Sequence, residues 1–370
     1  MSEIRRDLQS RFTLESSALG MGSVLPKVDL ARSSRPSALK QQRYRLLVVG
    51  LALPLGLFLA VAISLSFGSV SLTRPELWAA LLKQGSSINQ TIVWDLRLPR
   101  VISAIIVGSA LGMAGSLLQG MLRNGLASPF LLGISSGAGL AAVLIVGLKV
   151  WDIWLPLGAW LGAVIAMAIV FALAKTKGEI SVERLILGGV AVSTLFAAMQ
   201  TMLLLLSPDG QVQAALTWLT GSLNGRGWEE VTIVGPSVVV ALGLGCLLAR
   251  QVNLLNLGDD LAVGLGSSLV RSRLLSGAVA TLLTAGAVSI AGLVGFIGLL
   301  VPHGVRLLVG NDYRLVLPFS AIGGALVLCI ADLLARLGPI ELPVGIVTSI
   351  MGAPVFMWLL YRRSGSITRG

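Results

Sequence analysis

Side chains that can carry nucleophilic, redox or metal chemistry are few in this chain of 370 residues. Its single histidine, His303, and its two cysteines, Cys246 and Cys329, lie inside apolar runs and lack metal-site spacing. The sequence has no His-Glu-x-x-His, no Gly-x-x-x-x-Gly-Lys-Ser/Thr, and no Gly-x-Ser-x-Gly in a strand–turn–helix context. We therefore expect no catalytic residue, no bound metal and no cofactor held by this chain.

Ionisable groups inside the apolar runs are equally scarce. Asp332 is the only acidic residue well inside one of them. Proton- and sodium-coupled carriers usually place such groups near the middle of the membrane. We favour a simpler interpretation, in which Asp332 pairs with Arg336 one helical turn later. Transport would then draw its energy from elsewhere or be passive.

The composition explains which elements hold these residues. The chain is 55% hydrophobic and only 12% charged, whereas soluble domains carry about 25% charge. It is too apolar for a disordered protein, so we predict an all-α integral membrane protein. The net charge of +11 indicates basic cytoplasmic loops, not nucleic-acid binding. Gly108 and Gly112 stand at a spacing typical of closely packed membrane helices.

Apolar runs predict ten membrane spans with both termini in the cytoplasm. They cover about 46–67, 99–121, 129–148, 155–174, 184–206, 229–249, 274–291, 293–309, 315–335 and 342–361. The basic, serine-rich residues 1–45 read as a disordered cytoplasmic tail, and residues 46–363 as the transmembrane domain. Within the outer loop 207–228, a short interfacial helix is expected.

The inner stretch 251–270 is too polar for a span and too apolar for a free loop. Leucines can gather on one side of a short helix pair there, and Asp259 and Asp260 suit a helix N-terminus. One interpretation is an amphipathic helix lying on lipid. Two acidic residues facing an anionic leaflet make docking to a cytoplasmic protein the better interpretation.

Five motifs in order resemble the permease subunits of iron-siderophore, haem and vitamin B12 ABC importers, the FecCD family. They are LRLPR (96–100), GSLLQGMLRNGLASPFLLGISSGAG (115–139), LNLGDDLAVGLG (255–266), GLVGFIGLLVPHGVRLLVGNDYR (292–314) and ELPVGIVTSIMGAPVFMWLL (341–360). The resemblance covers roughly 46–363. Two departures are the long N-terminal tail and Gly125, where the family often has proline.

The resemblance implies a type II ABC importer permease fold in a bacterial plasma (inner) membrane. Two permease subunits, identical or different, would enclose the pathway. Two cytoplasmic ATPase subunits would use ATP and Mg, so this chain would not itself be an enzyme. A periplasmic or extracellular binding protein would deliver the substrate.

The resemblance also assigns roles to particular positions. Docking to the binding protein would use Arg97, Arg100 and Arg336, although snorkelling at the membrane interface is an alternative for the first two. Coupling to the ATPase would use Leu257, Gly258, Asp259, Asp260, Ala262, Leu265 and Gly266. The translocation path would include Ser193, Thr194, Met199, Gln200 and Met202, and the inner gate Ser181, Val182 and Glu183.

The expected function is ATP-driven import of a ferric siderophore, the commonest substrate class of the family. Haem or vitamin B12 import by the same machinery is the alternative within the family. From another class, an ATP-independent secondary carrier or channel would need ionisable groups in mid-membrane or a polar pore ring. Neither feature is evident in the sequence.

Overall fold

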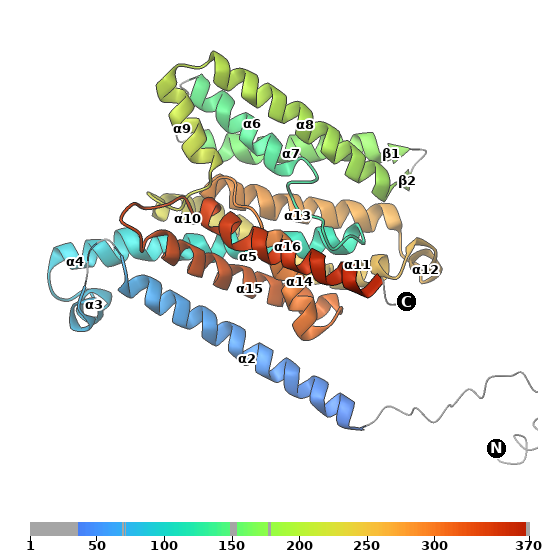
Figure 1. The fold of residues 1–370 in the computed structure, drawn as a ribbon, viewed down its shortest axis with the longest axis horizontal. Helices are drawn as coiled ribbons and strands as arrows, with labels where there is room; N and C mark the ends of the chain where they lie inside the picture. The colour runs from blue at the N-terminus through green and yellow to red at the C-terminus, as the bar shows by residue number, and fades with distance from the viewer. Residues whose placement is uncertain (1–35, 69, 71, 149–153, 177–178, 368–370) are drawn as a thin grey trace, which may run out of the picture. The chain divides into compact units, whose positions relative to one another are not determined.

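The computed structural model describes residues 36–367 except positions 69, 71, 149–153 and 177–178 (Figure 1). Most of the predicted tail therefore lies outside the described residues. Contacts divide the chain into the units Met1–Tyr44 and Arg45–Gly370. All contacts given below lie within the second unit.

The described residues are almost entirely helical. The helices are α2 Pro36–Ser66, α3 Arg74–Leu81, α4 Ser87–Thr91, the π-helix η1 Ile92–Arg97, α5 Leu98–Met121, α6 Ile134–Gly147, α7 Trp154–Ala174, α8 Val182–Leu206, α9 Asp209–Leu219, α10 Trp228–Leu247, α11 Ala249–Asn256, α12 Asp259–Gly264, α13 Leu269–Ala291, α14 Ile297–Val309, α15 Tyr313–Ala335 and α16 Val344–Ile367. A small antiparallel hairpin, β1 Lys175–Thr176 and β2 Glu179–Ile180, was not expected from the sequence.

Among the described residues, seven helical segments are long and apolar enough to cross a membrane. Three shorter apolar helices, α6, α14 and the Val344–Leu359 part of α16, coincide with the remaining predicted spans. The number of crossings and the side of each terminus stay predictions. Helix α9 lies where the interfacial helix was expected, and α11 and α12 form the expected short helix pair.

Helices α6 and α14 are shorter than the predicted spans 129–148 and 293–309. Residues 129–133 and 293–296 are not helical. Each helix begins after a residue with positive φ, 77° at Gly133 and 65° at Phe296. Hydropathy could not detect these breaks, because apolar residues continue through them. Backbone at membrane depth leaves a helix only where it is buried in protein or lines a cavity.

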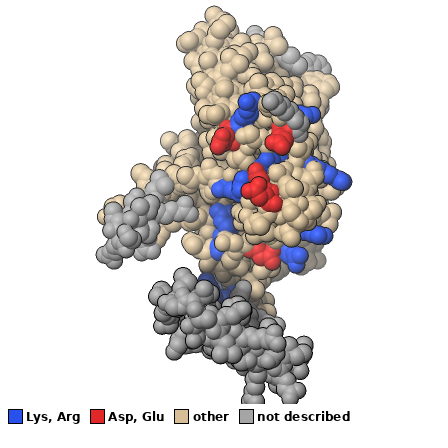
Figure 2. Space-filling view, turned by 90° about the vertical axis from the view of Figure 1, so that its right-hand side faces the viewer, with Lys and Arg blue, Asp and Glu red and all other residues tan. Residues whose placement is uncertain are grey.

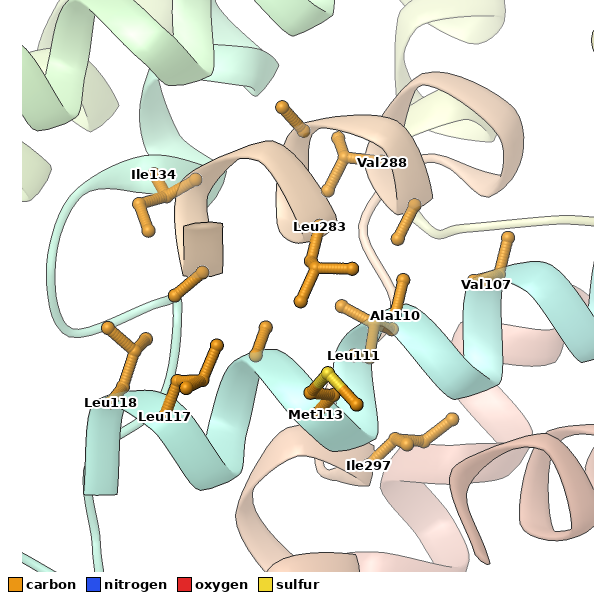
Figure 3. Close-up of a cluster of buried hydrophobic side chains, with 14 of the residues drawn as sticks. Val107, Ala110, Leu111, Met113, Leu117, Leu118, Ile134, Leu283, Val288 and Ile297 are labelled. Atoms are coloured by element: carbon orange, nitrogen blue, oxygen red, sulfur yellow. The ribbon is translucent and has the colours of Figure 1, made fainter. Parts of the chain in front are cut away.

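Helix α5 is the centre of one helix group and packs on α10, α13, α14 and α15. The approach to α15 is closest at Gly108 and Gly112. A Cβ at Gly112 would lie 2.1 Å from the carbonyl oxygen of Ser320, so only glycine permits this contact. Large apolar side chains of α5, α13 and α14 fill the space on other sides (Figure 3). This packing fits the small-residue pattern seen in the sequence.

Helices α6, α7 and α8 form a second group, which contacts α13 through α6 and α7 (Figure 1). The two groups differ in burial. The apolar window of α5 is 78% buried inside the chain, whereas that of α8 is 11% buried. Helix α8 therefore presents most of its apolar surface to lipid or to another subunit.

Candidate functional site

Three predicted docking arginines gather at one end of the molecule around Asp332. The carboxylate of Asp332 is fully buried and accepts hydrogen bonds from Arg100 at 2.8, 2.9 and 3.2 Å. Arg336, four residues later at the C-cap of α15, contacts Oδ2 of the same carboxylate at 3.0 Å. The expected pair of Asp332 with Arg336 is therefore present, and Arg100 joins it from α5. The third guanidinium nitrogen of Arg100 pairs with Glu341.

Arg97 and Arg336 also hold the end of α2. Arg97 donates to the carbonyl oxygens of Leu65, Ser66 and Val70, two of them at 2.6 and 3.1 Å. Arg336 donates to the hydroxyl of Ser64 at 2.8 Å. The last carbonyls of a helix lack partners within the helix, and these guanidinium groups supply them.

This outer cluster, defined as Arg97, Arg100, Asp332, Arg336 and Glu341, leaves little charge exposed. The side chain of Arg100 is 12% exposed and that of Arg336 is 7% exposed. Glu341 is more accessible, at 34%. The structure thus brings the three predicted arginines together, and most of their N–H donors bond to groups within the chain. Their meeting with a binding protein stays a prediction.

The predicted coupling residues lie in and around α12, which directly precedes α13 in the chain. Glycines with positive φ, 111° at Gly258 and 80° at Gly266, turn the chain on both sides of the helix. Ala262 is buried, while Leu257, Leu261 and Leu265 are each more than half exposed. A short helix fixed by its inner side and apolar on its outer side is a surface that another protein can cover.

Charged groups anchor α12 to the rest of the bundle. The carboxylate of Asp259 accepts from Arg273 at 2.8 and 2.9 Å and from Arg123 at 3.0 Å. We call Arg123, Asp259 and Arg273 the inner cluster. Figure 2 shows this end of the molecule, where basic and acidic side chains lie side by side among uncharged residues. The carboxylate is 38% exposed, unlike that of Asp332.

A neighbouring contact ties α11 to the start of α15. Asp312 accepts from the backbone N–H of Arg314 at 3.0 Å and from the Asn253 amide at 2.7 Å. Asn253 in turn accepts from the N–H of Tyr313 at 2.9 Å. The hydrogen bond from Arg314, followed by that from Asn253, holds the pKa of Asp312 below its ordinary value.

The predicted pathway residues do not share one face of α8. Ser193 donates to the carbonyl of Phe130 at 3.3 Å, and Gln200 packs beside Gly139 of α6. Thr194, Met199 and Met202 lie on the exposed side of the helix. At the N-terminal end of the helix, Ser181 caps α8 by accepting from the N–H of Arg184 at 3.5 Å. Of the other predicted gate residues, Val182 is half-buried and Glu183 is exposed.

A cavity of about 550 Å³ lies where the two non-helical breaks meet α16. Its wall includes Ser128 and Phe130 before α6, Gly295 and Phe296 before α14, and Ser349 on α16. Phe130 is the residue that Ser193 contacts, so the cavity adjoins the predicted pathway.

The break residues were missed as site candidates, although both breaks lie within the motifs. The available signal was Pro129 followed by Gly133 in one break and Gly292 followed by Gly295 in the other. Buried Gln119 supports both breaks, because its amide donates to the carbonyls of Ala127 and Gly298 at 3.3 and 3.2 Å. Gln119 thus ties the main chain just before the first break to the first turn of α14, just after the second.

Among the described residues, no group of three or more histidine, cysteine or carboxylate side chains is arranged to hold a metal ion. Cys246 is exposed and Cys329 is buried, in line with their positions in apolar runs.

Comparison with known proteins identifies the family. Residues 56–362 match the model of the FecCD transport family. The hemin transport system permease protein HmuU of Yersinia pestis is 38% identical over 331 residues, covering 86% of this chain and 96% of the relative. The Fe(3+)-citrate import system permease protein YfmE of Bacillus subtilis is 40% identical over 326 residues, covering 87% and 96%.

A solved structure gives the same answer for the fold. It is described as an inward-facing conformation of a metal-chelate type ABC transporter, is 31% identical, and superposes with a TM-score of 0.78. The match covers 84% of this chain and 98% of the solved chain. With its family model, its relatives and its apolar helices, this chain belongs to the FecCD family of ABC importer permeases, which are multi-pass proteins of the inner membrane.

Proposed function

We propose that this chain is the permease subunit through which a ferric siderophore passes from a binding protein into the cytoplasm. The observation that carries the proposal is the cavity between the two helix breaks, next to Ser193 of α8. Its wall is mostly apolar side chain and main chain. Such a wall binds a bulky chelate weakly enough to release it.

The substrate class rests on chemistry and on the relatives. Relatives are described as carrying hemin, Fe(3+)-citrate, siderophores or cobalamin, so iron chelates predominate among them. Among the described residues, the one buried carboxylate is Asp332, and two arginines neutralise it. Coupling to a proton or sodium gradient therefore has little support. Energy would come from ATP and Mg on a separate cytoplasmic subunit.

The partners follow from the two ends of the molecule and from α8. Two permease subunits would meet along the open side of α8, with Thr194, Met199, Gln200 and Met202 near the path. Two ATPase subunits would cover the exposed leucines around α12, from Leu257 to Leu265. The outer cluster would meet the binding protein, mainly through the exposed parts of Arg100 and Glu341.

Reconstitution in liposomes tests the substrate and the energy source together. The permease would be combined with the ATPase and binding protein that copurify with it, and offered a ferric hydroxamate siderophore, haemin or cyanocobalamin. We expect ATP-dependent uptake of the siderophore. Preferred uptake of haemin or cyanocobalamin would redirect the substrate class. Uptake without the ATPase, driven by an ion gradient, would establish a secondary carrier instead.

Charge reversal tests the docking role. We expect Arg97→Glu, Arg100→Glu and Arg336→Glu together to abolish capture of the binding protein by the purified permease. Because these side chains also hold the fold, the variant must first elute as a folded species from size exclusion. Arg74→Glu, on exposed α3, is the matched control and should leave capture unchanged. Unchanged capture by the folded triple variant would remove the docking assignment.

A further inference from the structure

The inner cluster has a contact that extends beyond α12. Arg273 lies in the first part of α13, and its side chain is 4% exposed. One of its terminal nitrogens holds both oxygens of Asp259, and the other donates to the carbonyl oxygen of Ile180 at 2.5 Å. A single buried guanidinium therefore joins the first residue of α12 to Ile180, which lies 93 positions before Arg273 in the chain.

Ile180 belongs to the segment that positions the inner end of α8. It is buried and pairs with Lys175 in the β1–β2 hairpin. The next residue, Ser181, caps α8. Arg184, in the first turn of α8, reaches back to the hydroxyl of Thr176 at 2.6 Å. The hairpin and the first turn of α8 are thus tied together, and Arg273 holds that unit through Ile180.

We propose that Arg273 is a positioning residue that couples displacement of α12 to the inner end of α8. A buried guanidinium is costly to leave without an acceptor. When α12 moves, Arg273 and Asp259 therefore move together, and the carbonyl of Ile180 follows. The proposal rests on the proposed function, in which an ATPase subunit covers α12.

The contacts made by Arg123 and by Arg273 differ in how well they can transmit a movement of α12. Arg123 also binds Asp259, but its side chain is 38% exposed and follows α5 in the chain. Water can replace that contact at small cost. The contact through Arg273 is shielded and has two acceptors in a fixed fork, which suits transmission of a movement. A carbonyl acceptor also cannot be altered by a change of side chain at position 180.

Hydrogen–deuterium exchange of the permease with its copurifying ATPase tests the proposal without a transported substrate. Exchange would be compared with and without ATP in two segments, 257–266 around α12 and 175–186 at the hairpin and gate. In the wild type we expect ATP to change exchange in both segments. In Arg273→Gln the change should persist at 257–266 and disappear at 175–186.

Two further variants keep the result interpretable. Arg271→Gln removes an exposed arginine from the same turn of α13 and should behave as wild type. Arg273→Lys keeps a buried positive charge but loses the fork, so it decides the matter if Arg273→Gln fails to assemble. We expect it to reduce ATP-driven uptake per ATP hydrolysed by about tenfold, within the coupling range that single residues show.

The outcomes separate this proposal from the proposed function. If ATP leaves exchange in segment 257–266 of the wild type unchanged, the coupling role that the proposed function gives to α12 is wrong. If 257–266 responds, and both Arg273 variants still transmit the ATP-dependent change to 175–186 at the wild-type level, the role of Arg273 is wrong. Loss of the change at 175–186 in either folded variant supports it.

Discussion

The inner cluster, at the start of α13, and the outer cluster, at the end of α15, combine arginine with aspartate in different ways. The outer cluster buries its carboxylate completely between two arginines, and its third arginine serves backbone carbonyls. The inner cluster leaves the carboxylate of Asp259 more than a third exposed and buries one of its arginines. The outer cluster therefore fixes α2, α5 and α15 together, while the inner one holds a short helix whose other side stays open.

The comparison shows what a count of charges cannot. From the sequence alone, the arginines predicted to lie outside the basic cytoplasmic loops suggest docking to an external partner. In the structure, most of their hydrogen bonds are already made within the chain. In the inner cluster the aspartate stays partly exposed, and exposed leucines flank it.

The largest expected effect is at Asp332. Replacing it with asparagine leaves Arg336 buried without its counter-charge and leaves Arg100 with Glu341 alone. Breaking a buried pair in this way costs about 3–5 kcal/mol. Thermal unfolding in detergent should show a large fall in Tm, whereas Asp95→Asn, at an exposed position near the same end, should leave it unchanged. Equal Tm values for the two variants would show that the outer cluster does not stabilise the fold.

A smaller effect is expected at Asp259. Asparagine retains one acceptor for Arg273, and the carbonyl of Ile180 remains. Loss of the charge-assisted hydrogen bonds between Arg273 and Asp259 should lower the free energy of unfolding by about 1.5–3 kcal/mol. The same Tm measurement, with Asp260→Asn as the control, checks it. A fall as large as that of Asp332→Asn would erase the distinction between the two clusters.

The backbone around α12 should respond less again. Gly258 has a φ of 111°, which side chains with a Cβ rarely adopt. Gly258→Ala should therefore cost about 1–2 kcal/mol and misplace α12. We expect weaker ATP-driven uptake with ATPase activity retained. Gly264→Ala, where a new Cβ meets no described atom within 4 Å, should be silent in both assays.

The smallest effect concerns pH. Because the folded-state pKa of Asp312 is lowered, its stabilising contribution is present above the unfolded-state pKa. It is lost as the pH falls through the folded-state pKa. Asp312→Asn should therefore lower Tm slightly at neutral pH and flatten its further loss at acidic pH, because asparagine cannot carry the stabilising charge. A wild-type acid profile in this variant would contradict the assignment.

Hydropathy and local spacing could predict much of this architecture. The apolar runs match the long helices, and the i, i+4 pair of Asp332 with Arg336 could be predicted because both lie on one helix. Arg100 could not be placed in that pair, since it is 232 positions away. The breaks before α6 and α14 were also hidden, because hydropathy reports burial and not backbone conformation. Phe296 illustrates this, since nothing in an apolar aromatic residue predicts a positive φ.

The seam at Gly112 and Ser320 has a consequence for how this protein can change over generations. Where the main chains of α5 and α15 touch, any added carbon atom collides with a carbonyl oxygen, so Gly112 cannot be replaced by another residue. Only 11% of the apolar window of α8 is buried within the chain, so most of its outward positions can vary without harming the monomer. Saturation mutagenesis should therefore find the lowest tolerance to substitution along that seam and high tolerance along the outward side of α8. Any intolerant positions on that side of α8 would mark contacts with a second subunit.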